Sequence, residues 1–290
     1  MSVPSAQFKP IYFDDVVAKA EKPLPYRFVF GVDPFGEPLY ASIDDPMFPH
    51  MLLAGTTASG KSIFVHSMLA QLLLNDSPTD LRVLFLDAGL ATQFPYAEVP
   101  HLWSPLVDSR EAALDQLQSV LDEMETRVRL FTEMGADDLD CYMRILPGAE
   151  MPVILVVIDE SARFTHDKEI KDSYLPKIMS LLRLGRKYGI HVLLGVQRPM
   201  ADILGVGMKD SLGQRFILRL EAPEHSENVL DGDTAAVGLS GYGDGIFRRG
   251  DDVIRFQGLY LPEYEDKPSG HLTVPGAVAA IIARWDEEED

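Results

Sequence analysis

Short apolar stretches alternate with longer amphipathic segments through the middle of the chain. The apolar stretches predict buried strands, at residues 50–56, 82–88, 153–159 and 191–197. The amphipathic segments carry apolar residues at helical spacing and predict helices, at residues 61–74, 109–134 and 172–188. Strands this uniformly apolar are covered on both faces. The alternation therefore predicts an α/β fold in which helices flank a mostly parallel sheet.

The two ends of the chain follow a different pattern. Segments 27–33 and 38–43 are β-rich and bounded by Gly, Pro and Asp, which predicts a hairpin or edge strands. After a glycine-interrupted segment, further elements are predicted: strands at 215–220, 245–249 and 253–261, and a helix at 274–285. We therefore expect an N-terminal arm (1–25), one α/β domain (26–265), and a C-terminal helix with an acidic tail (266–290).

The loop between the first apolar strand and the first helix carries the clearest chemistry. It fits G-x-x-x-x-G-K-[ST], the P-loop motif, in the strand–loop–helix context that this motif requires. Its residues are Gly55, Thr56, Thr57, Ala58, Ser59, Gly60, Lys61 and Ser62, followed by Ile63. In such a loop, backbone N–H groups surround phosphates, the lysine reaches the β and γ phosphates, and the serine hydroxyl binds Mg²⁺. We therefore expect residues 55–63 to bind ATP with Mg²⁺.

Polar residues close two of the later apolar strands. Asp159 and Glu160 end VILVVIDE, and Gln197 ends HVLLGVQ. We expect Asp159 to hold the Mg²⁺ shell and Glu160 to polarise the attacking water, because hydrolysis needs a carboxylate close to the γ phosphate. The amide of Gln197 is expected to sense the γ phosphate, with a plain polar strand end as the alternative.

Charge and cysteine usage narrow the possible functions. The chain has 26 basic and 45 acidic residues, a net charge of −19, which is far from the basic profile of a protein that grips nucleic acid over a broad face. The single cysteine, Cys141, excludes an internal disulfide and a multi-cysteine zinc site. His191 lies inside an apolar strand and is expected in the core. Without a signal-like start or an apolar run of about 20 residues, we expect a cytoplasmic location and no membrane insertion.

Several segments together resemble one family in both composition and order. They are HMLLAGTTASGKS (50–62), FPYAEVPHLWSPLV (94–107), EMETRVRLF (123–131), VVIDE (156–160), GRKYGIHVLLGVQRP (185–199) and LRLEAPEHSENVLDGD (218–233). Over residues 30–262 the chain resembles the FtsK/SpoIIIE motor ATPases. The resemblance implies a RecA-like ATPase that forms a ring, usually a hexamer, around double-stranded DNA and moves it by ATP hydrolysis.

The resemblance also implies roles for individual cations. An arginine from the neighbouring subunit can stabilise the transition state, and Arg127 is the first candidate and Arg186 the second. The alternative for Arg127 is a solvated helix face. Loops that face the ring channel map to residues 164–171 and 200–212, where the cations are Lys168, Lys171 and Lys209. These lysines would track DNA phosphates, or else they are ordinary surface lysines.

The chain departs from the family pattern in several places. Asp87-Ala88-Gly89 replaces the family's Asp-Pro-Lys, and Ser161 replaces a phenylalanine. Membrane segments, most of the preceding helical domain and a DNA-reading winged helix do not appear in the sequence. We therefore expect a minimal motor from a plasmid, phage or integrative element, used in DNA transfer, packaging or segregation. The N-terminal arm and the acidic tail are candidate docking sites for a recruiting protein.

Two alternatives stay open. A secretion ATPase of the same superfamily would move proteins, and an acidic body suits protein partners. A nucleotide-binding scaffold would bind ATP without turnover, although the joint presence of the P-loop, Asp159, Glu160 and Gln197 argues against it.

Overall fold

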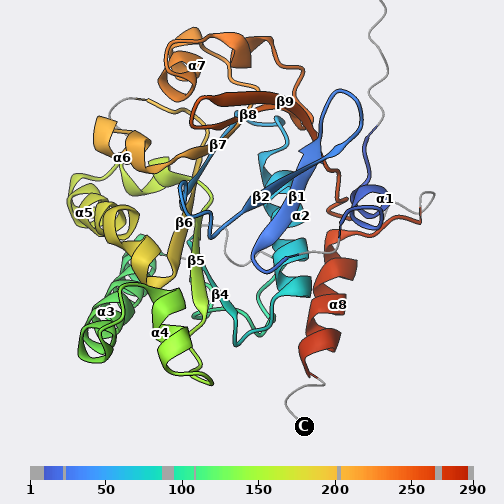
Figure 1. The fold of residues 1–290 in the computed structure, drawn as a ribbon. Helices are drawn as coiled ribbons and strands as arrows, with labels where there is room; N and C mark the ends of the chain where they lie inside the picture. Colours follow the sequence, from blue (N-terminus) through green and yellow to red (C-terminus); the bar gives the residue numbers. More distant parts are fainter. Residues whose placement is uncertain are drawn as a thin grey trace, which may run out of the picture.

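A single mixed sheet forms the centre of the protein. In the computed structural model, which describes residues 10–21, 24–86, 95–107, 109–200, 204–264 and 270–286, nine strands pair in the order β2-β1-β9-β8-β7-β3-β6-β5-β4 (Figure 1). The run from β7 to β4 is parallel, and the pairings from β7 through β8, β9 and β1 to β2 are antiparallel. The strands are β1 (Arg27–Val32), β2 (Pro38–Ser42), β3 (Met51–Ala54), β4 (Leu81–Leu86), β5 (Val153–Ile158), β6 (Ile190–Val196), β7 (Gln214–Leu218), β8 (Asp244–Arg249) and β9 (Asp252–Gly258).

Helices cover both faces of this sheet (Figure 1). One face carries α1 (Phe13–Val17), α2 (Lys61–Asn75) and α8 (Val274–Asp286), and the other carries α3 (Arg110–Met134) and α5 (Lys168–Leu184). Shorter pieces connect these elements: α4 (Leu139–Ile145), α6 (Val206–Ser211), α7 (Pro223–Leu230), and the 3₁₀ turns η2 (Ser161–Phe164), η3 (Gly185–Tyr188) and η4 (Ala235–Gly238). None of the helices in these described ranges is both long and apolar enough to cross a membrane.

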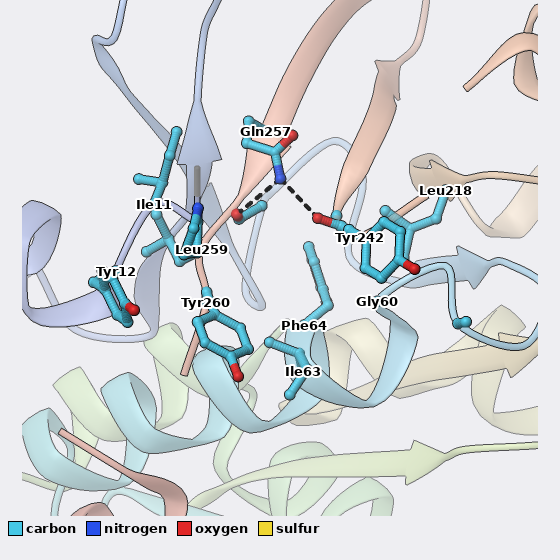
Figure 2. Close-up of a pocket in the computed structure, with 14 residues that line it drawn as sticks. Ile11, Tyr12, Gly60, Ile63, Phe64, Leu218, Tyr242, Gln257, Leu259 and Tyr260 are labelled. Carbon is cyan, nitrogen blue, oxygen red and sulfur yellow. Dashed lines mark hydrogen bonds between the residues drawn. The ribbon is translucent and has the colours of Figure 1, made fainter. Parts of the chain in front are cut away.

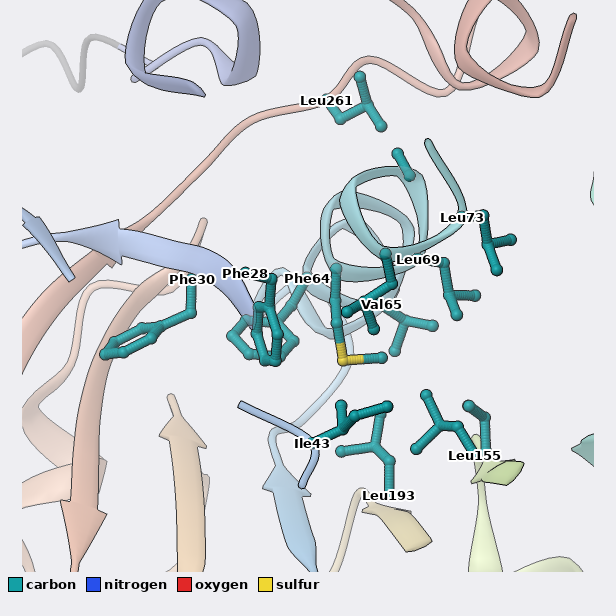
Figure 3. Close-up of a cluster of buried hydrophobic side chains, with 14 of the residues drawn as sticks. Phe28, Phe30, Ile43, Phe64, Val65, Leu69, Leu73, Leu155, Leu193 and Leu261 are labelled. Carbon is teal, nitrogen blue, oxygen red and sulfur yellow. The ribbon is translucent and has the colours of Figure 1, made fainter. Parts of the chain in front are cut away.

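The side chains of the apolar strands belong to two hydrophobic cores, one on each face of the sheet. In β3, Met51 and Leu53 belong to the cluster under α2, whereas Leu52 and Ala54 belong to the cluster under α3 and α5. This follows from the two-residue period of a strand, which sends successive side chains to opposite faces. Figure 3 shows the first cluster, in which α2 packs over the sheet. Because both faces of β3 are covered, the loop that follows β3 starts from a rigid base.

The predicted alternation of strands and helices is confirmed, with some differences. The helix expected at 172–188 begins at Lys168, because Asp167 caps it, and its last turn is the 3₁₀ turn η3. Helices α4 and α7 were not predicted. The expected arm contains α1 and pairs with the segment just after β9 through an isolated bridge between Tyr12 and Tyr260. The division at residues 25 and 265 stays a prediction, and Asp87, Ala88, Gly89 and the tail at 287–290 lie outside the described residues.

Candidate functional site

The P-loop lies at the carboxyl end of β3, near the middle of the sheet. Two backbone bonds extend the sheet into the loop: Gly55 N–H donates to Val196 O (3.0 Å) and Thr56 N–H donates to Arg219 O (3.0 Å). The loop then turns through Ala58 (φ 60°) and Gly60 (φ 105°) into α2, which Gly60 caps in a left-handed conformation. The first N–H groups of α2 therefore open onto the loop, as an anion site at a helix N-terminus requires.

The loop needs glycine at Gly60 for a steric reason as well as a conformational one. A Cβ on Gly60 would lie 2.7 Å from the nitrogen of Gly243, whose N–H donates to Ser59 O (2.8 Å). The glycine-rich stretch 239–245 thus packs directly against the P-loop. The sequence showed this stretch as glycine-rich but gave no indication of its partner.

Three residues predicted from two motifs, the P-loop and the Asp-Glu pair after β5, meet beside this loop. Lys61 Nζ donates to Asp159 O (2.7 Å) and lies 3.6 Å from Asp159 Oδ1 and 3.5 Å from Glu160 Oε2. The contact arises because β3, β6 and β5 are neighbours and their carboxyl ends share one edge of the sheet. The ammonium and both carboxylates therefore form one charged cluster at the mouth of the P-loop.

Glu160 is held more firmly than Asp159. Its Oε1 accepts from Ala162 N–H (3.3 Å) and Gln197 N–H (3.5 Å), and the residue is only 7% exposed. Asp159 is more open, with 26% of its side chain exposed. The side chain of Gln197 is exposed, so the structure links Gln197 to Glu160 through its backbone rather than its amide.

The residues present fit a phosphate and a hard cation. The exposed hydroxyl of Ser62 and the carboxylate of Asp159 are oxygen ligands of the kind Mg²⁺ prefers. Ser59 Oγ is buried inside the loop and has no hydrogen-bond partner within the described chain. Burial lowers the pKa of His66, one turn into α2, to about 4, with the charge of Asp159 opposing the shift. His66 is therefore neutral at pH 7 and adds no charge to the site.

Ser161, which departs from the family pattern, has a structural role. Its Oγ lies 3.0 Å from Tyr174 Oη, and both residues are buried. A hydroxyl pair thus joins η2 to α5 at this position. The other departure, Asp87-Ala88-Gly89, lies outside the described residues.

The structure does not support the role across a subunit interface that the resemblance implied for Arg127. This residue is 0% exposed, its Nε donates to Glu123 Oε1 (2.8 Å), and its NH1 donates to Tyr188 O (2.7 Å). Burial lowers the pKa of the guanidinium, and Glu123 opposes that shift. Arg127 fastens α3 to η3 and cannot reach another molecule from this position. Nor does it lie on a solvated helix face.

The other predicted cations are placed differently. Arg186, in η3, is exposed, and so is Lys168 at the start of α5, while Lys171 is half-buried. Lys209 forms an ion pair with Asp231 (2.8 Å), which also binds Arg215 and Arg248. Three cations share this single carboxylate, so the ion pair does not neutralise them, and the predicted contact of Lys209 with DNA stays a prediction. His191 is buried and bonds Pro49 O (2.9 Å), so its predicted core position is confirmed.

Comparison with known proteins identifies relatives over most of the chain. The model of the FtsK/SpoIIIE family matches residues 15–235. The DNA translocase FtsK of Helicobacter pylori is 33% identical over 257 residues, 85% of this chain, and the DNA translocase SftA of Bacillus subtilis is 30% identical over 257 residues, 86% of this chain. The matches span only 29% and 26% of those relatives, so the chain corresponds to less than a third of their length.

Solved structures agree on the fold. The cytoplasmic domain of the type VII secretion ATPase EccC of Thermomonospora curvata has a TM-score of 0.80 at 24% identity, covering 95% of this chain and 35% of that one. The pCW3 conjugation coupling protein TcpA, determined with ATPγS, has a TM-score of 0.71 at 26% identity, covering 88% and 70%. The predicted α/β class, with central parallel strands and antiparallel edge strands, is confirmed.

Proposed function

Because the chain belongs to the FtsK/SpoIIIE family of ATPases, we propose that it is the ATP-hydrolysing motor of a ring-forming, double-stranded DNA translocase. The observation that carries this proposal is the meeting of Lys61, Asp159 and Glu160 beside the P-loop. The similarity to DNA translocases, and to a protein described as a conjugation coupling protein of pCW3, supports DNA as the cargo and a mobile element as the setting.

Each residue of the site has a distinct task under this proposal. Residues 55–63 bind the phosphates of ATP through backbone N–H groups and Lys61, and Ser62 with Asp159 would hold Mg²⁺. When bound, the metal would neutralise the negative charge that develops on the phosphates during hydrolysis. Glu160 orients the attacking water and accepts its proton. The two N–H groups on Oε1 fix the carboxylate with Oε2 turned toward Lys61.

Arg186 is the remaining candidate to act across a subunit interface, because it is exposed whereas Arg127 is buried. Lys168 and Lys171 follow β5 on the same edge of the sheet as the P-loop, and we propose that they meet DNA phosphates in the ring channel. A few lysines per subunit, repeated around a ring, would track the backbone without reading sequence. The overall charge of −19 then confines DNA to that channel.

Steady-state ATP hydrolysis with and without long linear duplex DNA at low salt tests this proposal. We expect DNA to stimulate turnover, Glu160→Gln to abolish turnover while nucleotide binding persists, and Glu224→Gln, on an exposed part of α7, to behave as wild type. Absence of multiple turnover under all conditions would refute the ATPase assignment and favour a scaffold.

Mixing two inactive variants tests the ring. Arg186→Ala subunits keep an intact P-loop, and Lys61→Ala subunits keep an intact Arg186, so a mixed ring contains some complete sites. We expect partial recovery of hydrolysis in the mixture, and ordinary activity for Arg183→Ala, an exposed neighbour at the end of α5. A mixture as inactive as its components would exclude action of Arg186 across an interface.

A protein cargo is the second candidate function, and the net charge of −19 favours it. Under this alternative, DNA does not change the rate of ATP hydrolysis, and a protein substrate increases it. The same assay therefore separates the two candidates, since only a DNA motor responds to duplex at low salt.

A further inference from the structure

A cavity of about 630 Å³ opens from the side of the P-loop (Figure 2). Ala58 and Gly60 belong both to the P-loop and to the cavity wall, and Ile63 and Phe64 from the first turn of α2 line it further. A ligand whose phosphates lie in the P-loop therefore has this cavity next to it. The volume is within the range of about 300–1,000 Å³ typical of small-molecule sites.

The chemistry of the wall suits a nucleoside. It is mostly apolar, and the rings of Tyr12, Tyr242 and Tyr260 lie around it (Figure 2). Gln257 Nε2 donates to Tyr242 O (2.9 Å) and to Gly258 O (3.4 Å), which fixes the loop that carries Tyr242. A planar base with apolar faces and a polar edge matches such a wall, because aromatic and aliphatic side chains cover its faces.

One side of the cavity comes from the N-terminal segment. Residues 10–14, which we call the strap, run beside the segment that follows β9: Phe13 N–H donates to Tyr260 O (3.0 Å), and Tyr260 N–H donates to Ile11 O (2.7 Å). Phe13 is 3% exposed and anchors the strap in the core. The strap is thus a built part of the cavity wall.

The strap is also fastened to the other end of the chain. The ring of Tyr12 stacks on that of His271, with centroids 3.6 Å apart and an interplanar angle of 9°. His271 Nδ1 lies 2.9 Å from Asp14 Oδ1. His271 precedes α8, so segments 257 residues apart in sequence meet at one wall of the cavity.

We propose that this cavity takes the nucleoside of the bound nucleotide and that the docked strap forms one wall of the nucleoside site, so that nucleotide affinity depends on docking of residues 10–14. The inference rests on the proposed nucleotide binding at the P-loop. Its consequence is reciprocal: a nucleotide that contacts the strap stabilises the docked segment by the same free energy that the strap adds to binding.

Binding of ATP and of inorganic tripolyphosphate to the full chain, measured by calorimetry, tests the proposal. Tripolyphosphate offers the same phosphates without a nucleoside. We expect Tyr12→Ala, which removes an aromatic ring from the wall, to weaken ATP binding about tenfold and leave tripolyphosphate binding unchanged. Ile11→Trp, which fills the cavity from the strap, should do the same. Tyr264→Ala, at an exposed tyrosine outside the cavity, is the matched control and should bind both as wild type.

Hydrogen exchange gives a second readout that does not depend on activity. We expect ATP to slow exchange in residues 10–14 and at His271, and tripolyphosphate to leave it unchanged. Wild-type ATP affinity in both strap variants, or equal protection by the two ligands, would overturn the proposal.

The proposal fails separately from the proposed function. Lys61→Ala should lose both ligands, and if it binds them normally, nucleotide binding at the P-loop is itself wrong. If DNA fails to stimulate hydrolysis while the strap variants still lose ATP selectively, only the translocase proposal falls.

Discussion

Replacing Arg127 with alanine should lower the stability of the folded protein rather than disable an intersubunit contact. The substitution removes a charge-assisted bond to Tyr188 O (2.7 Å), breaks the pair with Glu123 (2.8 Å) and leaves a cavity under α3. Losing a hydrogen bond from a charged group costs about 1.5–3 kcal/mol, and truncating a large buried side chain adds about 2 kcal/mol or more.

Two features reduce the total. Arg127 is itself fully buried, and its NH2 has no partner within the described chain. Removing the side chain therefore also removes the desolvation cost of a buried charge that is only partly hydrogen-bonded. Glu123 keeps 29% of its side chain exposed and can be rehydrated after the pair is broken. We therefore expect a net loss of about 3 kcal/mol, which is about 6 °C in melting temperature at roughly 2 °C per kcal/mol for a chain of this size.

Thermal unfolding followed by circular dichroism measures this effect. Arg186→Ala is the matched control, because its exposed side chain should change stability by less than about 0.5 kcal/mol. The reasoning is refuted if Arg127→Ala melts like wild type and yet loses hydrolysis, since that combination indicates a contact made outside its own subunit.

Two further substitutions separate local causes. Gly60→Ala should abolish nucleotide binding and lower stability, because its Cβ would lie 2.7 Å from Gly243 N and its φ is 105°. The control Gly36→Ala, at φ 91° with nothing within 4 Å of the added Cβ, should lower stability alone. Equal nucleotide binding by the two variants in calorimetry would contradict the steric argument. Burial raises the pKa of Asp76 from 3.8 to about 6, with the Tyr26 N–H opposing the shift, so the folded chain holds this proton more tightly and loses that stability as pH rises through about 6. The melting temperature of Asp76→Asn minus that of wild type should therefore increase as the pH rises from about 4 to about 7. A constant difference across this range would show that the carboxyl does not titrate there.

The site residues at the carboxyl edge of the sheet were predictable because short, continuous sequence motifs contain them. The P-loop has a spacing that backbone geometry demands, and Asp159 and Glu160 close an apolar strand. Parallel neighbours bring such strand ends together without further information. What the sequence could not give is the contact of Gly60 with Gly243, since it joins loops 183 residues apart in an order set by the sheet.

Arg127 shows a different kind of failure, because the signal was present. It lies three residues after Met124 and four before Phe131, both buried, and so falls on the inner stripe of α3. The sequence-based alternatives were a role across a subunit interface or a solvated helix face, because a charged residue is rarely fully buried. Only the carbonyl of Tyr188, 61 residues away, explains why an arginine is accommodated.

The short helices escaped prediction for another reason. Helix α4 has seven residues and α7 has eight, too few to show a clear apolar period. Their start signals were visible, in the capping side chain of Asp138 and in Pro223 at the first turn. Isolated segments of this length are not stable helices, and the rest of the fold decides whether they form.

The packing of α8 on α2 has a mechanical consequence. Trp285 Nε1 donates to Leu73 O (2.8 Å) near the far end of α2, while Gly60 caps its near end. With 15 residues at 1.5 Å each, α2 is a rod of about 22 Å with the P-loop at one tip and the C-terminal helix clamped to the other. A force applied through α8 would therefore act on α2 at the end opposite the P-loop.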